Sequence, residues 1–135
     1  LLTLHCIMSD HQFPYHVNPD DHCETPFIAY QHIQKLLQHL VSANKTTTTT
    51  IYDPYYCNGT VKQHLNALGF PNVINEKKDC YSTWSSIPYD ILVTNPPYSD
   101  DHIEKLMKFV LGNNKPYFLL MPKWVHRKSY FPSSG

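Results

Sequence analysis

Tyr89-Asp90-Ile91-Leu92-Val93-Thr94, followed directly by Asn95-Pro96-Pro97-Tyr98, is the most informative part of this sequence. Residues 89–94 form a short, β-branched apolar run with a proline on either side, which predicts a buried strand. Because ligands in open α/β sheets bind beyond the carboxyl ends of the strands, residues 95–98 are expected to face a ligand. The two prolines make the turn rigid, so it can hold the Asn95 amide and the Pro96 carbonyl side by side as hydrogen-bond acceptors. An amino group on a planar ring would fit between these acceptors and the flat face of Tyr98.

A second polar loop, residues 53–59, lies between a predicted strand at 50–52 and a predicted helix at 60–68. A strand, a tight polar loop and a helix are the layout of a nucleotide-type cofactor site. Residues 72–75 are predicted to form the next strand, which ends at Glu76. A carboxylate at this point can accept hydrogen bonds from two adjacent hydroxyl groups, such as those of a ribose. The alternative for Glu76 is an exposed turn charge beside the two lysines that follow it.

Two longer helices are predicted from apolar residues at helical spacing. Thr25 is the expected N-cap of the first helix, Pro26 its first residue, and the helix is expected to end near residues 42–44. The second helix is expected to begin after a cap at Ser99 or Asp100. Its buried side is expected to consist of Ile103, Leu106, Met107 and Val110.

The order of the elements predicts the fold class. Residues 117–122 read as a further strand, and most of the threonine tract at 46–50 is expected to be a linker. Strands and helices therefore alternate along the chain. This alternation predicts an α/β fold with a Rossmann-like sheet and helices on both faces.

Four motifs follow one another in the order Thr25-Pro26, Asp53 to Gly59, Glu76 and Asn95 to Tyr98. Their order and spacing resemble those of S-adenosylmethionine-dependent methyltransferases that modify nitrogen, chiefly the N6-adenine enzymes with an N-P-P-Y motif. The resemblance covers about residues 20–130 and implies a class I methyltransferase fold. Only a short gap separates Glu76 from the next strand, and the family's last two strands are not evident. The domain is therefore expected to be compact or truncated.

The resemblance also implies roles for individual residues. In this family the Asn side chain and the first Pro carbonyl bind the hydrogens of the target amine and the aromatic residue stacks on the base, which implies the catalytic set Asn95, Pro96, Pro97 and Tyr98. The implied cofactor is S-adenosylmethionine, and the residues implied to hold it are Thr25, Pro26, Asp53, Tyr55, Tyr56, Cys57, Gly59, Glu76 and Asp79. Cys57 stands where the family usually has a glycine. Because a side chain hinders close backbone approach, weaker cofactor binding is expected.

Basic and aromatic residues alternate near the end of the chain. Charge suits phosphate and rings suit bases, so this segment is a candidate nucleic-acid-binding site made of Lys123, Trp124, His126, Arg127 and Lys128. A solvated C-terminal tail is an equally open interpretation of the same residues.

Two alternatives to adenine methylation stay open. Protein N5-glutamine methyltransferases also carry N-P-P-Y, although they usually have a more Gly-rich loop and the Thr25-Pro26 segment argues against them. The other alternative is a catalytically inactive methyltransferase fold that acts as a binding module or as the subunit of a protein partner. The side chain at Cys57 favours this second alternative.

Length and composition limit the number of domains, the kinds of partner and the association with a membrane. The chain has 135 residues, 41% of them hydrophobic, and a formal net charge of zero, which predicts one domain with its own core and no global attraction to nucleic acid. Residues 1–24 are expected to be irregular and 25–135 to form the methyltransferase-like domain. No apolar run is long enough to span a membrane, and no signal peptide is visible.

The cysteines and histidines point to an intracellular protein without a metal site. The four cysteines form no C-x-x-C pair and are expected to be reduced, which favours an intracellular location, either nucleus or cytoplasm. A group of potential zinc ligands has a spacing that matches no standard zinc site, so no metal is expected there; it comprises Cys6, His11, His16, His22 and Cys23.

Overall fold

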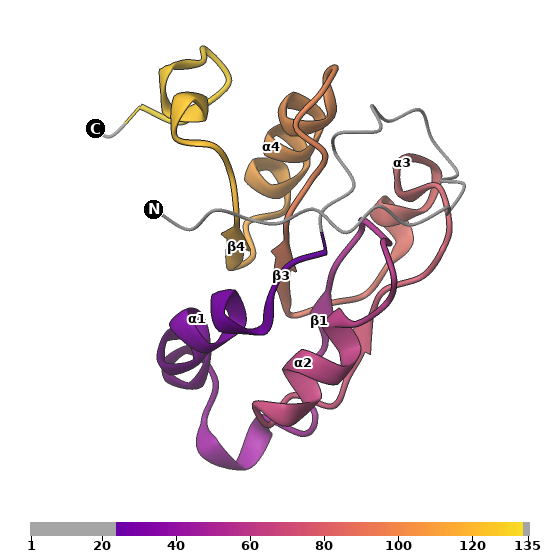
Figure 1. Cartoon of the computed structure of the whole chain (residues 1–135), viewed down its shortest axis with the longest axis vertical. Coiled ribbons are helices and arrows are strands. Elements are labelled where there is room, and N and C mark those ends of the chain that lie inside the picture. Colours follow the sequence, from indigo (N-terminus) through magenta and orange to yellow (C-terminus); the bar gives the residue numbers. More distant parts are fainter. Residues whose placement is uncertain (1–23, 134–135) are drawn as a thin grey trace.

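The computed structural model describes residues 24–133 and has an α/β architecture. All four strands of the described part run parallel in one sheet, in the order β2-β1-β3-β4 (Figure 1). The strands are β1 (Ile51–Tyr52), β2 (Val73–Ile74), β3 (Ile91–Thr94) and β4 (Tyr117–Leu119). A helix lies in each connection between them, as parallel strands require. This arrangement is compatible with a Rossmann-like fold.

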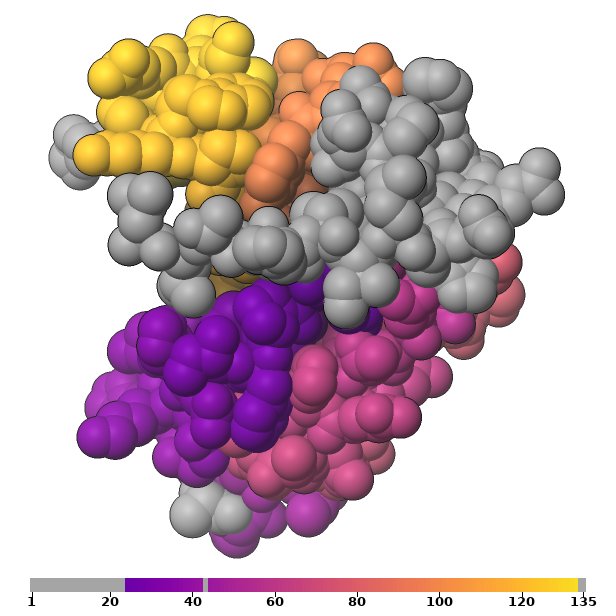
Figure 2. Space-filling model, viewed as in Figure 1, coloured from indigo at the N-terminus to yellow at the C-terminus, as the bar shows by residue number. Residues whose placement is uncertain are grey.

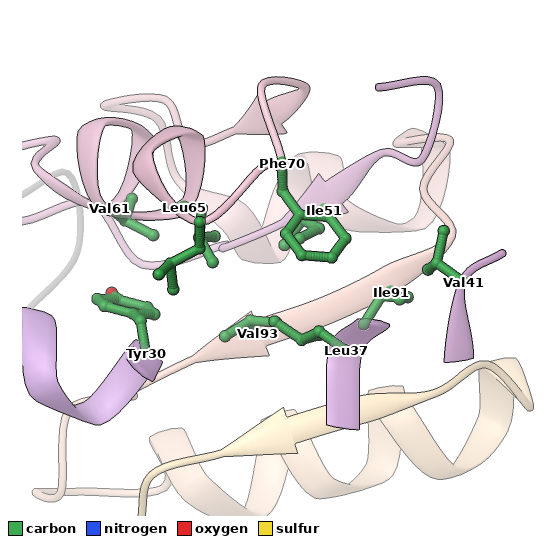
Figure 3. Close-up of a cluster of buried hydrophobic side chains, with 10 residues drawn as sticks. Tyr30, Leu37, Val41, Ile51, Val61, Leu65, Phe70, Ile91 and Val93 are labelled. Atoms are coloured by element: carbon green, nitrogen blue, oxygen red, sulfur yellow. The ribbon is translucent and has the colours of Figure 1, made fainter. Parts of the chain in front are cut away.

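Helices cover both faces of the sheet, as predicted. Because successive residues of a strand point to opposite faces, β1 places Ile51 in one core and Tyr52 in the other. The helices α1 (Phe27–Leu40) and α2 (Val61–Ala67) pack on the Ile51 face (Figure 3). The helices α3 (Cys80–Thr83) and α4 (His102–Asn113) pack on the opposite face.

The hydrophobic core on the Ile51 face packs α1 and α2 against β1 and β3, which lie next to the predicted cofactor loop. Phe70, Leu65 and Leu37 have no solvent exposure, and they lie against Ile51 of β1 and Val93 of β3 (Figure 3). These contacts connect α1, α2 and two strands. The relative positions of the strand ends therefore depend on this core.

The predicted helix starts were wrong by one or two residues. α1 begins at Phe27 and its N-cap is Pro26 rather than Thr25, because the extended Pro26 supplies the carbonyl that accepts from the Ala29 N–H. α4 begins at His102 and its N-cap is Asp101 rather than Ser99 or Asp100. Asp100 has a φ of 51°, which a helical residue does not adopt.

Three short 3-10 helices complete the described part: η2 (Ala43–Lys45), η3 (Trp84–Ser86) and η4 (Lys123–Arg127). The threonine tract after η2 is a folded turn rather than a linker. The Thr48 and Thr49 hydroxyls donate to the Lys45 carbonyl at 3.1 and 2.8 Å, and Thr49 is buried. The connection from Glu76 to β3 holds only α3 and η3, which agrees with the short gap noted in the sequence.

Two further expectations concern a membrane-spanning helix and the irregular segment at residues 1–24. Among residues 24–133, no helix combines the length and apolar character needed to cross a membrane. The expected irregular segment lies outside the described residues, except for Glu24.

Candidate functional site

Polar residues follow three neighbouring strands directly and meet at the carboxyl edge of the sheet. Asp53 follows β1, Asn75 follows β2 and Asn95 follows β3. The Asp53 N–H donates to the Ile74 carbonyl at 2.9 Å, and the Asn75 Nδ2 donates to the Asp53 carbonyl at 3.0 Å. The end of β1 is therefore hydrogen-bonded to the end of β2.

Asp53 is a buried carboxyl group that accepts from two neutral donors among the described residues. Its Oδ1 accepts from the Thr94 hydroxyl at 2.6 Å and from the Tyr55 N–H at 3.1 Å. The side chain is buried, and this burial raises the pKa of Asp53 to about 7, although both hydrogen bonds oppose the shift. The sequence pattern did not single out Thr94, because it reads only as the last residue of a strand.

We expect the protein to become more stable when Asp53 is replaced by Asn. The folded pKa is raised, so the stability that Asp53 contributes is fully present below about pH 4 and is lost as the pH rises through about 7. At about pH 8 the buried charge is mostly formed, and Asp53→Asn, whose Oδ1 can still accept both hydrogen bonds, should raise the free energy of unfolding by on the order of 2–4 kcal/mol. Urea unfolding at mildly acid and mildly alkaline pH measures this difference.

The matched control for this prediction is Asp90→Asn. Asp90 is exposed and its Oδ2 accepts from the Thr50 N–H at 2.8 Å, so the same change alters a carboxylate that water still solvates. Its effect should stay within about 0.5 kcal/mol at either pH. A gain in stability for Asp53→Asn that is the same at both pH values would contradict the buried-charge explanation.

A small polar cavity, here called the loop cavity, lies inside the predicted cofactor loop. It has a volume of about 30 Å³, room for one or two water molecules, and is lined by Glu24, Thr25, Tyr30, Asp53, Tyr55, Cys57, Gly59, Val61, Asn75 and Asn95. The structure thus brings together Thr25, Asp53, Cys57, Gly59 and Asn95 from three predicted motifs. The buried Asn75 Oδ1 has no hydrogen-bond partner among the described residues and can accept from a ligand.

The backbone of the loop explains which positions need glycine. Gly59 has a φ of 77°, which side chains rarely adopt, and a Cβ there would lie 3.2 Å from Cε2 of Tyr56. Cys57 is not among the residues with positive φ, so its side chain causes no backbone strain. The Tyr56 ring lies against Gly59 and is not part of the loop-cavity lining.

Glu24 is a residue of this site that the sequence pattern missed. Its carboxylate accepts from the Asn58 N–H at 2.9 Å and from the Thr60 hydroxyl. It therefore joins the segment before α1 to the start of α2. The signal that could have indicated it is an acidic side chain placed directly before the Thr25-Pro26 motif.

A second cavity, here called the β2 cavity, lies beside the ends of β1 and β2. It has a volume of about 230 Å³ and is lined by Tyr52, Pro54, Ile74, Glu76, Lys78, Cys80, Thr83, Ser86 and Ile87. Lys78 Nζ lies 2.5 Å from Glu76 Oε2, and this hydrogen bond is the main cause that lowers the pKa of Glu76. Asp79 is not part of the lining. It is the N-cap of α3, where its Oδ1 accepts from the Tyr81 N–H at 3.0 Å.

The tetrapeptide after β3 combines a buried backbone with an exposed ring. Pro96 and Pro97 are buried, and Tyr98 is 37% exposed. The Tyr98 hydroxyl donates to Asn95 Oδ1 at 2.7 Å and contacts the Leu120 carbonyl at 3.3 Å. Asn95 Oδ1, which is predicted to accept from the target amine, therefore already accepts from the hydroxyl of Tyr98, whose ring is predicted to stack on the base.

Asn95 also borders an apolar cavity on the α1 face, here called the α1 cavity. The cavity has a volume of about 130 Å³ and is lined by Thr25, Ala29, Tyr30, Ile33, Val93, Thr94, Asn95, Phe118, Leu119 and Leu120. Thr25, Tyr30 and Asn95 line both this cavity and the loop cavity. Asn95 thus lies where a polar and an apolar space meet.

A partly buried hydrogen-bond network connects three parts of the site. Tyr55 Oη lies 3.2 Å from Tyr81 Oη, and Tyr81 Oη bonds Nδ1 of His102 at the start of α4. Burial is the main cause that raises the pKa of Tyr81, so it stays protonated at neutral pH. The network connects the loop, α3 and α4, and His102 was not among the predicted site residues.

The predicted nucleic-acid-binding residues lie on and after η4, beyond β4. Lys123, Trp124, His126, Arg127 and Lys128 are all exposed. Lys128 Nζ lies 5.4 Å from the centre of the Trp124 ring, within the range of a cation–π contact. These residues do not line the loop cavity or the β2 cavity.

Potential metal ligands do not gather in the part of the chain that the structure describes. Within residues 24–133, no three His, Cys, Asp or Glu residues come together in a way that could hold a metal ion. The His- and Cys-rich stretch noted in the sequence, from Cys6 to Cys23, lies outside the described residues.

Comparisons with protein-family models, with curated proteins and with solved structures find no match to this chain. The methyltransferase family therefore stays a prediction based on the motifs.

Proposed function

We propose that this protein is an S-adenosylmethionine-dependent methyltransferase that acts on the exocyclic N6 amine of adenine in DNA or RNA. The observation that carries the proposal is the position of Asn95 between two cavities. One cavity is polar and borders the predicted cofactor loop, and the other is apolar and suits a planar ring. An amide at this junction can accept from an amine on one side while facing a cofactor on the other.

The residues at the strand ends fit the cofactor. Asn75 Oδ1, a buried acceptor without a described partner, suits the ammonium group of the methionine half, and the ionised Glu76 suits the ribose hydroxyls. When bound, S-adenosylmethionine supplies a methyl group on a positively charged sulfur. The loop cavity would have to widen for the methionine half, which requires Glu24 to release Asn58 and Thr60.

The tetrapeptide would orient the target amine. Asn95 Oδ1 and the Pro96 carbonyl would each accept one amine hydrogen, which aims the nitrogen lone pair away from both acceptors. The Tyr98 ring would stack on the base after it leaves its own stack. Asn95 would then exchange its hydrogen bond from the Tyr98 hydroxyl for one from the amine. Positioning of this kind supplies a large part of the acceleration of group transfer.

We expect S-adenosylhomocysteine to raise the melting temperature of the protein. A ligand that binds only the folded state adds roughly 2.7 kcal/mol of stability at about a hundred times its Kd. Glu76→Ala should reduce the shift, because it removes the acceptor for the ribose hydroxyls. The matched control Glu104→Ala removes a glutamate that lines neither cavity and should leave the shift unchanged. Differential scanning fluorimetry measures the wild type and both variants.

The outcomes separate the alternatives. If millimolar ligand leaves the melting temperature unchanged, the cofactor site is wrong and an inactive binding module is the better explanation. If the cofactor binds, labelled-methyl transfer to adenine-containing oligonucleotides and to glutamine-containing peptides decides between nucleic acid and protein as substrate. Methyl transfer to the peptides alone would mean that the substrate is a glutamine amide of a protein rather than adenine.

A further inference from the structure

The charges of this chain are strongly segregated, although its net charge is zero. None of the 11 acidic residues follows Glu104, whereas six of the 11 basic residues do: Lys105, Lys108, Lys115, Lys123, Arg127 and Lys128. Lys105 and Lys108 pair with Asp101 and Glu104 of α4. The other four have no acidic partner among the described residues, so they give the surface after α4 a local positive charge.

This basic segment lies beside an apolar groove, here called the C-terminal groove. The groove has a volume of about 410 Å³ and lies between α4, β4 and η4, lined by Met107, Tyr117, Leu119, Met121, Pro122, Lys123, Val125, His126, Phe131 and Pro132. Its two basic side chains, Lys123 and His126, stand among apolar ones. Figure 2 shows the segment after β4 next to α4 and away from α2.

Two large aromatic side chains are exposed here. Trp124 is 43% exposed and Phe131, which lines the groove, is 39% exposed. The buried Val125 anchors η4 on Ile103 and Met107 of α4, so the segment is packed on the fold rather than loose. This packing argues against the solvated-tail interpretation of the same residues.

The groove is also connected to the proposed reaction centre. The Tyr98 hydroxyl contacts the Leu120 carbonyl, and the next residue, Met121, lines the groove. A strand of nucleic acid with one base at Asn95 could therefore continue along β4 toward Lys123.

We infer that the C-terminal groove binds single-stranded nucleic acid, so that the substrate of the proposed methyltransferase is an unpaired segment; this inference rests on the proposed function. The cations match phosphates, and the exposed rings and apolar walls match bases that are free to stack on protein. The bases of a duplex stack on each other and cannot reach Phe131 in the groove. A duplex would gain only the phosphate contacts.

The test is fluorescence anisotropy with labelled oligothymidylate and with a G·C duplex of the same length, both without cofactor. The single strand should bind at least about tenfold more tightly than the duplex. Trp124→Ala and Phe131→Ala should each weaken single-strand binding by roughly 5- to 100-fold. Leu36→Ala is the matched control, because Leu36 is 56% exposed on α1, away from the groove.

Charge is tested separately by salt dependence. Lys123→Gln and Arg127→Gln should each reduce the slope of log affinity against log salt by about 0.7, the value for one phosphate contact on a single strand. Lys35→Gln, an exposed lysine of α1, should leave the slope unchanged. Slopes that stay the same in the first two variants would overturn the phosphate contacts.

The probes distinguish failure of this inference from failure of the proposed function. Oligothymidylate contains no adenine and needs no cofactor, so its binding persists even if the protein transfers no methyl group. Equal affinity for strand and duplex, or unchanged binding in both aromatic variants, overturns the inference. Methyl transfer to duplex adenine as fast as to unpaired adenine overturns it as well and leaves the proposed function intact.

Discussion

Replacing Asn95 by alanine is expected to lower methyl transfer to adenine by at least about a hundredfold, the loss that a misaligned reacting group produces. The amide supplies one of the two acceptors for the target amine, and alanine cannot replace it. Cofactor affinity should stay nearly unchanged, because Asn75, Glu76 and the loop are assigned to the cofactor. Labelled-methyl transfer to adenine oligonucleotides, run beside calorimetric titration of the cofactor, measures both quantities.

Three further variants make this result specific. Asn66→Ala is the same chemical change on an exposed position of α2 and should retain full activity. Tyr98→Phe removes the hydroxyl that donates to Asn95 Oδ1 and keeps the ring, so it should retain most activity, whereas Tyr98→Ala should weaken substrate binding by roughly 1–3 kcal/mol. Full activity in Asn95→Ala would falsify the catalytic assignment. Loss of cofactor binding in that variant would make Asn95 a structural residue.

Replacing Phe70 by alanine is expected to lower the free energy of unfolding by roughly 3–5 kcal/mol, the usual effect of removing a buried aromatic ring. Phe70 has no solvent exposure and packs among Ile51, Leu65 and other residues of the core on the α1 face (Figure 3). The cavity left behind would loosen the contact between α2 and β1. Since small domains have total stabilities of roughly 5–15 kcal/mol, this variant should unfold at a much lower urea concentration.

Phe131→Ala is the matched control for stability, because the same ring is partly exposed there and its loss should change the free energy of unfolding far less. Phe70→Leu keeps most of the apolar volume and should lie between the wild type and Phe70→Ala. Urea unfolding followed by circular dichroism measures the series. Equal losses for Phe70→Ala and Phe131→Ala would mean that the core on the α1 face is not packed as described.

Local pattern was sufficient for the four strands and for the helices α1, α2 and α4. Short apolar runs became β1, β2, β3 and β4, and the apolar residues of α4 are buried as their spacing predicted. The helix starts were less certain, because the residue that begins a helix depends on backbone angles that composition does not specify. Asp100, with its positive φ, is such a case.

Several residues could be identified only in three dimensions. Thr94 lies 41 positions after Asp53 and donates to it, and Tyr81 meets His102 across 21 positions. The Glu24 carboxylate accepts from the N–H of Asn58, which lies 34 positions later in the chain. Each of these pairs is far apart in the sequence, so no local pattern connects one side chain to its partner.

The α/β arrangement and the polar residues at the strand ends follow from local sequence patterns, because periodicity and proline placement act over a few neighbouring residues. The raised pKa of Asp53 arises only in the folded chain, since its burial depends on α1 and α2 packing over β1. The position of Asn95 between a polar and an apolar cavity also arises only in the folded chain. The same is true of the basic segment that borders an apolar groove, because α4, β4 and η4 meet only after the chain has folded.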